Sequence, residues 1–293
     1  MALSIMNNSS SLSIQNQLNR TNGALGTALE RLGSGLRINS AKDDAAGLQI
    51  ANRLTAQSTG QKAALYNSNN AMTMMQTADS AFDEMTNIAD RMKELATQAA
   101  NGTNSGDEFT AMDSEYQALA EEMASIMSNT SFGAGTKLLA GTDSKFSTAD
   151  GVDFQVGSST AETLNVDVST QVGAVNTAVG SVAADGTYTA GTLGNLSSQA
   201  NGSTAIDTID TLINNIGSAR SALGASMNRL DHTINNVTNM KEATDSAASN
   251  LLDADYAVET SNMSKQQLLM NSGVSVLSVS NSTNQMIASL LRG

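Results

Sequence analysis

The stretch that decides the fold is residues 65–99, LYNSNNAMTMMQTADSAFDEMTNIADRMKELATQA. Its apolar residues recur at intervals of three, four or seven, which places them on one face of an α-helix. At 1.5 Å per residue this helix would be about 50 Å long. The face consists of Leu65, Met72, Met75, Phe82, Met85, Ile88, Met92, Leu95 and Ala99. Because so narrow an apolar face cannot be buried alone, the pattern predicts partner helices.

The same period appears at both ends of the chain. The N-terminal seam consists of Leu18, Leu25, Leu29, Leu32 and Leu36. The GSG sequence at 33–35 weakens it, and residues 39–40 indicate a restart. The C-terminal counterpart consists of Ile206, Ile209, Ile213, Ile216, Leu223, Met227, Leu230, Ile234, Val237 and Met240. Residues 251–291 are apolar at intervals but rich in Val and Ser, which have lower helix propensity.

Local signals mark the ends of the predicted helices. The NGTN sequence at 101–104 is a turn signal, and Ser105 with Glu108 forms a capping box for a further helix. Between 133 and 205 the composition shifts to Gly, Ser, Thr and Ala. The short alternating segments 154–156 and 164–168 are typical of strands. The predicted order is therefore helices, then strands and loops, then helices.

Composition excludes several classes of protein. The 293 residues include 15 basic and 28 acidic side chains, for a formal charge of −13. Such a surface repels phosphate, so we expect no nucleic-acid partner. The absence of cysteine excludes disulfides and thiolate chemistry, and the single histidine, His232, excludes a two-His zinc motif. No proline interrupts the helices, and aromatics at 3% do not suit an enzyme with an apolar pocket.

No segment predicts membrane insertion or a cleaved signal. No stretch approaches the ~18 apolar residues of a membrane span, and the first residues lack a basic start and an apolar run. We therefore expect no membrane partner, and either a cytoplasmic protein or export by a route that reads no such signal. The ends, such as 10–16 and 278–282, mix Asn, Gln and Ser with apolar residues, and we expect them to become ordered on assembly.

Several blocks of sequence resemble bacterial flagellin. The longest is residues 29–48, LERLGSGLRINSAKDDAAGL, which closely resembles the family's N-terminal signature. Similar blocks lie at 91–105, 228–236, 253–257 and 289–292. Together they cover both helical ends of the chain, roughly 1–170 and 205–293. The segment 246–250, SAASN, lacks the arginines of many relatives, and 282–285 lacks their proline, which puts local subunit contacts in question.

The resemblance implies a mainly α fold: a long antiparallel helical rod built from both chain ends, with a small β-hairpin and loop region in the middle. It implies an inner coiled-coil domain lining the filament channel at 1–43 and 254–293. The helical rod domain with hairpins would take 44–170 and 205–253, and 171–204 would be the variable surface-exposed region. The inner-domain residues that it assigns to self-assembly are Leu18, Leu25, Leu29, Leu32, Leu36, Leu268, Leu269, Val276, Leu277, Leu290 and Leu291.

The resemblance also implies a function and partners. The chain would be the subunit of the extracellular flagellar filament, a helical homopolymer for swimming, exported unfolded by the flagellar type III route. Its partners would be further copies, the flagellar cap and hook-junction proteins, and a secretion chaperone at the C-terminal segment. A host Toll-like receptor that senses flagellin would recognise Arg91, Leu95, Gln98 and Glu115, each of the type found in receptor-activating flagellins. Leu95 is also a position in the helical seam.

Other kinds of protein are also considered: a second member of the family, an adhesin and an enzyme. Within the family, the hook–filament junction protein shares terminal helices but diverges in the quoted blocks, and a secreted helical adhesin would fit the heptads alone. The motifs do not favour an enzyme, because Gly133-x-Gly135 lacks a third glycine and Lys137 does not fit a phosphate-binding loop. We expect no catalytic residue, cofactor or metal. The Ser and Thr hydroxyls of the middle are either plain solvent-facing groups or O-glycan sites, and intact mass distinguishes the two.

Overall fold

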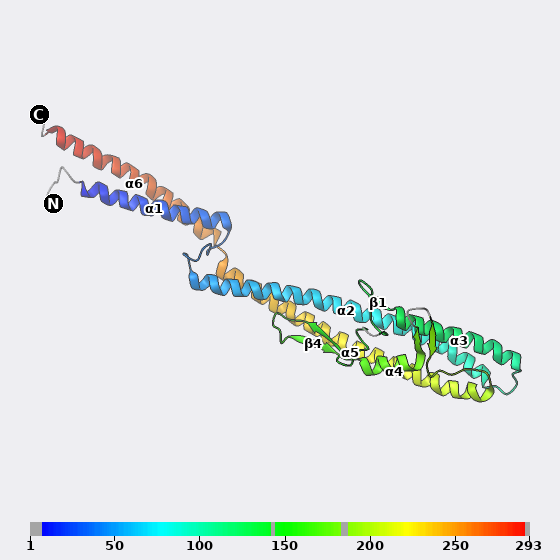
Figure 1. Cartoon of the computed structure of the whole chain (residues 1–293). Coiled ribbons are helices and arrows are strands. Elements are labelled where there is room, and N and C mark those ends of the chain that lie inside the picture. Colours follow the sequence, from blue (N-terminus) through cyan, green and yellow to red (C-terminus); the bar gives the residue numbers. More distant parts are fainter. Residues whose placement is uncertain (1–7, 142–143, 183–186, 291–293) are drawn as a thin grey trace. The chain divides into compact units, whose positions relative to one another are not determined.

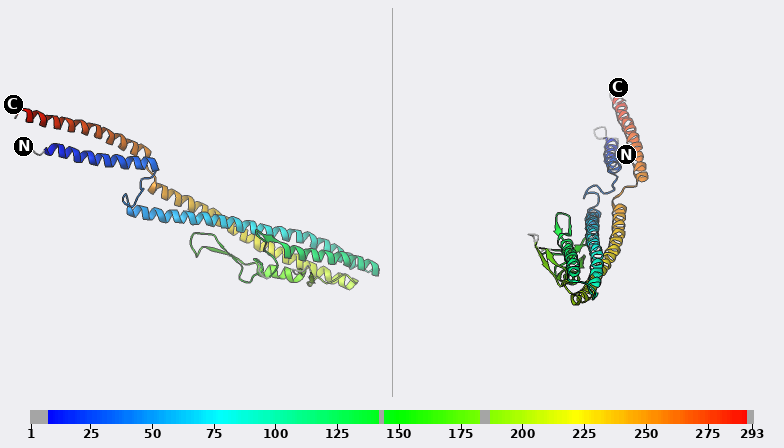
Figure 2. Two further views of the ribbon diagram at one scale, coloured as in Figure 1. Left: turned by 45° about the horizontal axis from the view of Figure 1, so that its top comes forward. Right: turned by 90° about the vertical axis from the view of Figure 1, so that its right-hand side faces the viewer.

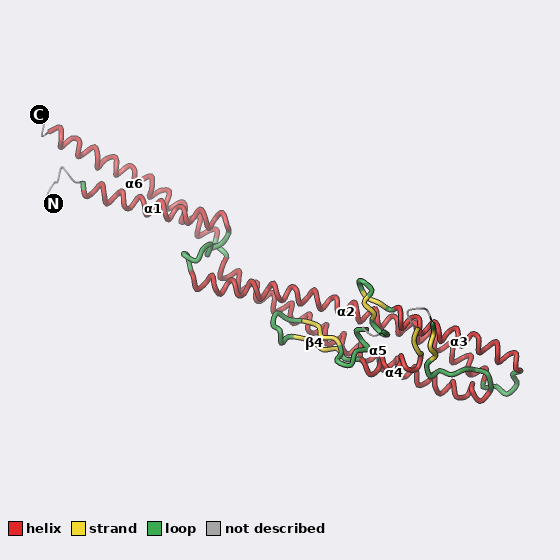
Figure 3. The backbone as a smooth tube through the Cα atoms, viewed as in Figure 1, coloured by secondary structure: helices red, strands yellow, loops and turns green. Residues whose placement is uncertain are grey.

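The structure, a computed structural model, describes residues 8–141, 144–182 and 187–290. Within these residues there are six helices and three small two-stranded hairpins, all three of which lie between α3 and α5, and Figure 3 shows how far helix predominates. The mainly α fold is confirmed. The chain divides into two units, residues 1–57 with 242–293 and residues 58–241. Helices α2 (Ala45–Ala99) and α5 (Gln199–Leu252) contribute residues to both.

In the first unit, α1 (Ser9–Ser34) and α6 (Tyr256–Leu290) lie side by side and antiparallel (Figures 1 and 2). The side chain of Asn8 caps α1 by accepting a hydrogen bond from the Ser11 N–H at 3.0 Å. Helix α1 ends at Ser34, and the next residue, Gly35, caps it with a φ of 74°, a conformation that suits glycine. The break predicted from the GSG sequence is therefore present.

Backbone bonds join the two segments that follow α1 and precede α6. Leu36 forms a bridge with Asp253, and the Arg37 N–H donates to the Leu252 carbonyl at 2.6 Å. The Ala254 N–H donates to the Gly35 carbonyl at 2.9 Å. Chain segments more than 200 residues apart in sequence are thus fixed against each other by a small piece of sheet-like pairing.

The seam of α1 differs by one residue from its predicted course. Leu18 and Leu32 are half-buried, Leu25 is buried, and the next inward position is Ala28, at 3% exposure. Leu29 is 52% exposed, because the alternation of three and four residues from Leu18 passes through Ala28. Leu36 lies beyond the end of the helix.

The second unit has one hydrophobic core, formed by α2, α3 (Gly106–Asn129), α4 (Ser169–Val179) and α5. Figures 1 and 2 show the four helices running alongside one another. Its largest fully buried side chains include Tyr116, Phe82, Phe146, Met75, Met85, Met92, Met123 and Met127. Most of the predicted seam of residues 65–99 is buried, with Leu65, Met72 and Ile88 half-buried. Methionine fills this core where aromatic residues are scarce.

Small antiparallel hairpins cover part of this unit. They pair β1 (Ser131–Phe132) with β2 (Thr136–Lys137), β3 (Val152–Gln155) with β4 (Thr163–Val166), and β5 (Gly180–Val182) with β6 (Tyr188–Ala190). In the second hairpin Val152 lies opposite Val166 and Gln155 opposite Thr163. The strands predicted at 154–156 and 164–168 are therefore the two halves of one hairpin.

The predicted surface region at 171–204 contributes to the core instead of standing apart from it. Its α4 buries Val172, Val175 and Val179, and the following loop buries Leu193 and Leu196. These apolar residues cannot remain in water once a neighbouring helix offers an apolar face. The exposed positions between them are mostly polar, and residues 183–186 lie outside the described residues.

Candidate functional site

The four residues assigned to receptor recognition lie on α2 and α3. Arg91 reaches across from α2, where its Nε and Nη2 donate to Glu115 Oε1 on α3 at 3.0 and 2.8 Å. Its Nη1 donates to Glu94 Oε2 at 2.8 Å. Hydrogen bonds to Glu115 and then Glu94 raise the pKa of the Arg91 guanidinium. All three side chains are exposed, so this is a surface cluster rather than a buried ion pair.

Leu95 lies beneath this cluster rather than on it. It is 2% exposed and packs in the core of the second unit, whereas Gln98, one turn further along α2, is exposed. A large partner can therefore contact Arg91, Gln98 and Glu115 directly, but not Leu95. The helical period explains the difference, because Leu95 shares its face with Met92 and Ala99.

The residues assigned to self-assembly separate into two groups on α6. Leu268, Leu269 and Val276 are 69%, 45% and 50% exposed, while Leu277 is half-buried and belongs to the side that faces α1. Leu290 is the last residue of α6. Leu291 lies outside the described residues.

Sequence reasoning missed further members of the exposed group on α6. They are Tyr256, Val258, Val274, Val279 and Met286, between 54% and 64% exposed. The signal was present, since Val258, Leu269 and Val276 are separated by 11 and 7 residues, which brings them to one side of a helix. We call the eight residues Tyr256, Val258, Leu268, Leu269, Val274, Val276, Val279 and Met286 the α6 apolar surface.

Ion pairs join the helices within each unit. In the first, Arg31 Nη1 donates to Glu259 Oε1 at 3.0 Å, and Glu259 is almost completely buried. In the second, Arg220 bridges Asp79 and Asp83 of α2 at 3.0 and 2.7 Å, and Lys93 pairs with Asp210. Each pair joins an N-terminal to a C-terminal helix, so both chain ends are needed to complete each unit.

The described residues contain neither a candidate metal site nor a candidate membrane span. No group of three or more His, Cys, Asp or Glu side chains there is placed to hold a metal ion. No helix within the same residues is long and apolar enough to cross a membrane.

Comparison with known proteins decides the family. The profile of the bacterial flagellin N-terminal helical region matches residues 5–144, and that of the C-terminal helical region matches 206–291. Flagellin A of Vibrio anguillarum is 32% identical over 381 aligned positions, covering 100% of both chains. A flagellin of Listeria innocua is 36% identical over 285 positions, covering 96% of both. The chain belongs to the bacterial flagellin family.

Family membership confirms the main expectations from the sequence. Flagellins are structural proteins of the extracellular flagellar filament that serve motility, so the chain is a filament subunit that assembles with copies of itself, and it is not an enzyme. A solved structure assigned as a flagellar hook-associated protein from Vibrio parahaemolyticus covers 72% of this chain and 100% of its own, with 16% identity and a TM-score of 0.53. That likeness concerns the fold alone, and the hook–filament junction reading is not favoured.

Proposed function

We propose that the α6 apolar surface is the contact through which copies of this flagellin pack together in the inner part of the filament. The observation that supports this proposal is that its eight apolar side chains are exposed in the single chain. Burying one Leu or Val side chain contributes about 1.5–3 kcal/mol, so a surface of this size strongly favours association. The inner domain would then comprise 1–43 and 254–293, with the helical rod domain at 44–170 and 205–253.

The opposite side of α6 supports this proposal. The positions that face α1 alternate every three or four residues and include polar groups: Glu259, Met263, Gln266, Met270, Gly273, Leu277 and Ser280. Pairing with α1 therefore uses a partly polar seam, while the eight apolar side chains of the α6 apolar surface remain in water. A helix with this distribution needs a second apolar partner beyond α1.

Seeded polymerisation tests the proposal. The double substitution Leu268→Gln and Leu269→Gln should raise the monomer concentration needed to extend sheared filament seeds by roughly a hundredfold, because two apolar side chains no longer leave water. The matched control is Leu268→Met with Leu269→Met, which keeps the apolar area and should extend seeds normally. Circular dichroism checks that both monomers remain helical. Normal extension by the Gln variant would refute the assignment of the surface.

The remaining family expectations form part of the same proposal. The subunit would travel unfolded through the type III export channel, held beforehand by a secretion chaperone at its C-terminal segment, and would meet hook-junction and cap proteins at the filament. The absence of both proline and cysteine supports this route, since neither slow prolyl isomerisation nor disulfide pairing would delay refolding after export. Co-purification of the chaperone with the full chain, and its loss on deleting 254–293, tests the segment.

A second proposed function is recognition by the host Toll-like receptor that senses flagellin. The observation that favours it is the exposed Arg91–Glu115 pair between α2 and α3, with Gln98 exposed on the same helix. The Glu115 carboxylate holds the guanidinium in one orientation, which lowers the cost of ordering it against a partner. Leu95 would contribute by supporting α2 from below.

Receptor signalling by single variants tests the second function. Arg91→Ala and Glu115→Ala should each reduce signalling while leaving thermal unfolding nearly unchanged, because exposed ion pairs contribute little to stability. Leu95→Ala should lower signalling only together with stability, because it leaves a cavity in the core. Undiminished signalling by a combined Arg91→Ala and Glu115→Ala variant would contradict the site.

A further inference from the structure

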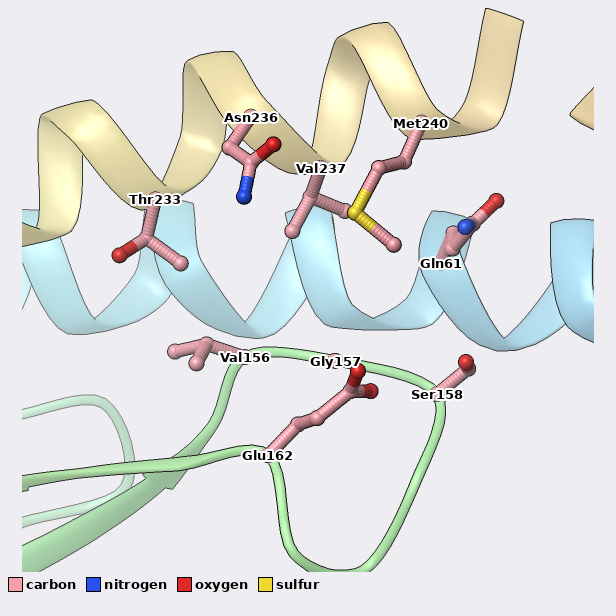
Figure 4. A pocket seen from close by; sticks show the side chains of 9 residues that line it. All are labelled: Gln61, Val156, Gly157, Ser158, Glu162, Thr233, Asn236, Val237 and Met240. Carbon is pink, nitrogen blue, oxygen red and sulfur yellow. The ribbon is translucent and has the colours of Figure 1, made fainter. Parts of the chain in front are cut away.

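A pocket of about 210 Å³ opens within residues 58–241, between the loop that joins β3 to β4 and the helices α2 and α5 (Figure 4). Gln61 of α2 and Asn236, Val237 and Met240 of α5 line one side, and the loop lines the other with Val156 and Glu162. Val156 and Val237 are 8% and 7% exposed and form an apolar floor. The mouth is polar.

The side chain of Gln61 has no partner in this pocket. The residue is 1% exposed, and neither its Nε2 nor its Oε1 makes a hydrogen bond. A buried amide without hydrogen bonds loses the energy of its hydration and gains nothing in return, so buried polar groups in folded proteins are nearly always paired. Gln61 therefore indicates a partner that the single chain does not supply.

The loop that closes the pocket is held in place. The Gln155 Nε2 lies 2.8 Å from the Gly157 carbonyl and 2.6 Å from the Ser159 carbonyl, and Glu162 Oε2 accepts from the Ser159 N–H at 2.8 Å. Gly60 lets this loop approach α2, because a Cβ there would lie 2.8 Å from Ser158 Cβ. The pocket is therefore bounded by a loop that its own hydrogen bonds hold in place.

The chemistry of the lining defines what would fit. The Gln61 amide offers two N–H donors and one carbonyl acceptor, and its natural complement is another carboxamide, which supplies an acceptor and donors in one plane. Glu162 is the charged group among the lining residues and disfavours an acidic occupant. Met240, 37% exposed and unbranched, is a side chain that can move aside at the mouth.

We propose that this pocket receives a carboxamide side chain, Asn or Gln, from a neighbouring copy of the chain in the filament. The proposal rests on self-assembly. A homopolymer places the same neighbouring surface beside every copy, so one contact of this kind would be repeated along the filament. Gln61 would then be paired in the filament and unpaired in the monomer.

The experiment compares Gln61→Leu with wild type in both states. Leucine keeps most of the volume and removes the amide, so the unfolding temperature of the monomer should stay equal or rise. The critical concentration for extending seeds should rise several-fold. The matched control is Gln76→Leu, the same change at an exposed position of α2, which should alter neither value. Oxidation of Met240 by hydrogen peroxide, followed by mass spectrometry, should slow several-fold on going from monomer to filament.

Each outcome bears on the proposal. If wild type forms filaments but Gln61→Leu assembles at the same concentration and Met240 oxidises equally in both states, the pocket assignment fails while self-assembly stands. If Gln61→Leu lowers the unfolding temperature of the monomer, the amide is already satisfied within the chain and the proposal is overturned. If wild-type monomer never extends seeds, the proposed function fails and the pocket proposal fails with it.

Discussion

At the scale of single residues, Tyr116 shows how burial changes the pKa of a side chain. It is fully buried on α3, and its hydroxyl donates to the Leu193 carbonyl at 2.9 Å. Burial raises the pKa of the Tyr116 phenol well above its ordinary value of 10. Burial also raises the pKa of Tyr188. The folded state therefore keeps neutral phenols at a pH where the unfolded chain ionises them.

This difference predicts a loss of stability in alkali. Below pH 10 the phenols are neutral in both the folded and the unfolded chain, so their contribution to the free energy of unfolding is fully present. Above pH 10 the free energy of unfolding should fall by at most about 1.4 kcal/mol per pH unit for each phenol. Tyr116→Phe should cost roughly 1–3 kcal/mol at neutral pH, since the Leu193 carbonyl loses its donor, and should make the alkaline fall shallower. Urea unfolding between pH 8 and 11 measures both. Tyr66→Phe, at a phenol 69% exposed, should change neither.

At the scale of elements, two glycines of α5 separate the effect of close helix packing on stability from the effect of helix propensity. Gly202 is buried against the end of α2, where a Cβ would lie 2.7 Å from the Ala100 nitrogen and 2.8 Å from the Ala99 carbonyl carbon. Backbone atoms cannot move aside as a flexible side chain can. Gly202→Ala should therefore destabilise the protein by about 1–3 kcal/mol, although alanine is the better helix former.

The matched substitution lies in the same helix. Gly217 is exposed, and a Cβ there would meet nothing within 4 Å. Gly217→Ala should stabilise by about 0.5–1 kcal/mol through helix propensity alone. Urea unfolding of both variants gives the two signs. A stabilising Gly202→Ala would show that α2 and α5 do not approach each other closely at that point.

The helices also show which parts of the fold could be predicted from sequence periodicity and which could not. The long helices followed from their apolar spacing, and the capping box is present, with Glu108 Oε2 accepting from the Ser105 N–H at 2.6 Å. Helix α4 was missed because its Gly, Ser, Thr and Val composition has weak propensity, and its form depends on burying Val172 and Val175. Leu29 was misplaced because two adjacent phases both fit a run of leucines. The unpaired amide of Gln61 depends on tertiary contacts, which no local pattern reveals.

At the scale of the whole molecule, the two units differ in how much apolar surface they bury. Helix α1 has only Thr21, Leu25 and Ala28 as buried residues, and the buried residue of α6 among those whose side chains are described is Glu259. The unit of 58–241 contains nearly the whole hydrophobic core. Because local opening is easiest where few apolar contacts must break, residues 1–57 and 242–293 should open well before the rest.

Limited digestion with trypsin measures this difference. Trypsin should cut the monomer first in the opened ends, where Arg31, Arg37, Lys42 and Lys265 offer sites, and should leave a resistant fragment close to 58–241. Assembly should protect the same sites, because the α6 apolar surface leaves water only when copies pack together. Ends that resist trypsin in the monomer as well as in the filament would mean that the α1–α6 pair is stable alone. Its exposed apolar side chains would then need an explanation other than ordering on assembly.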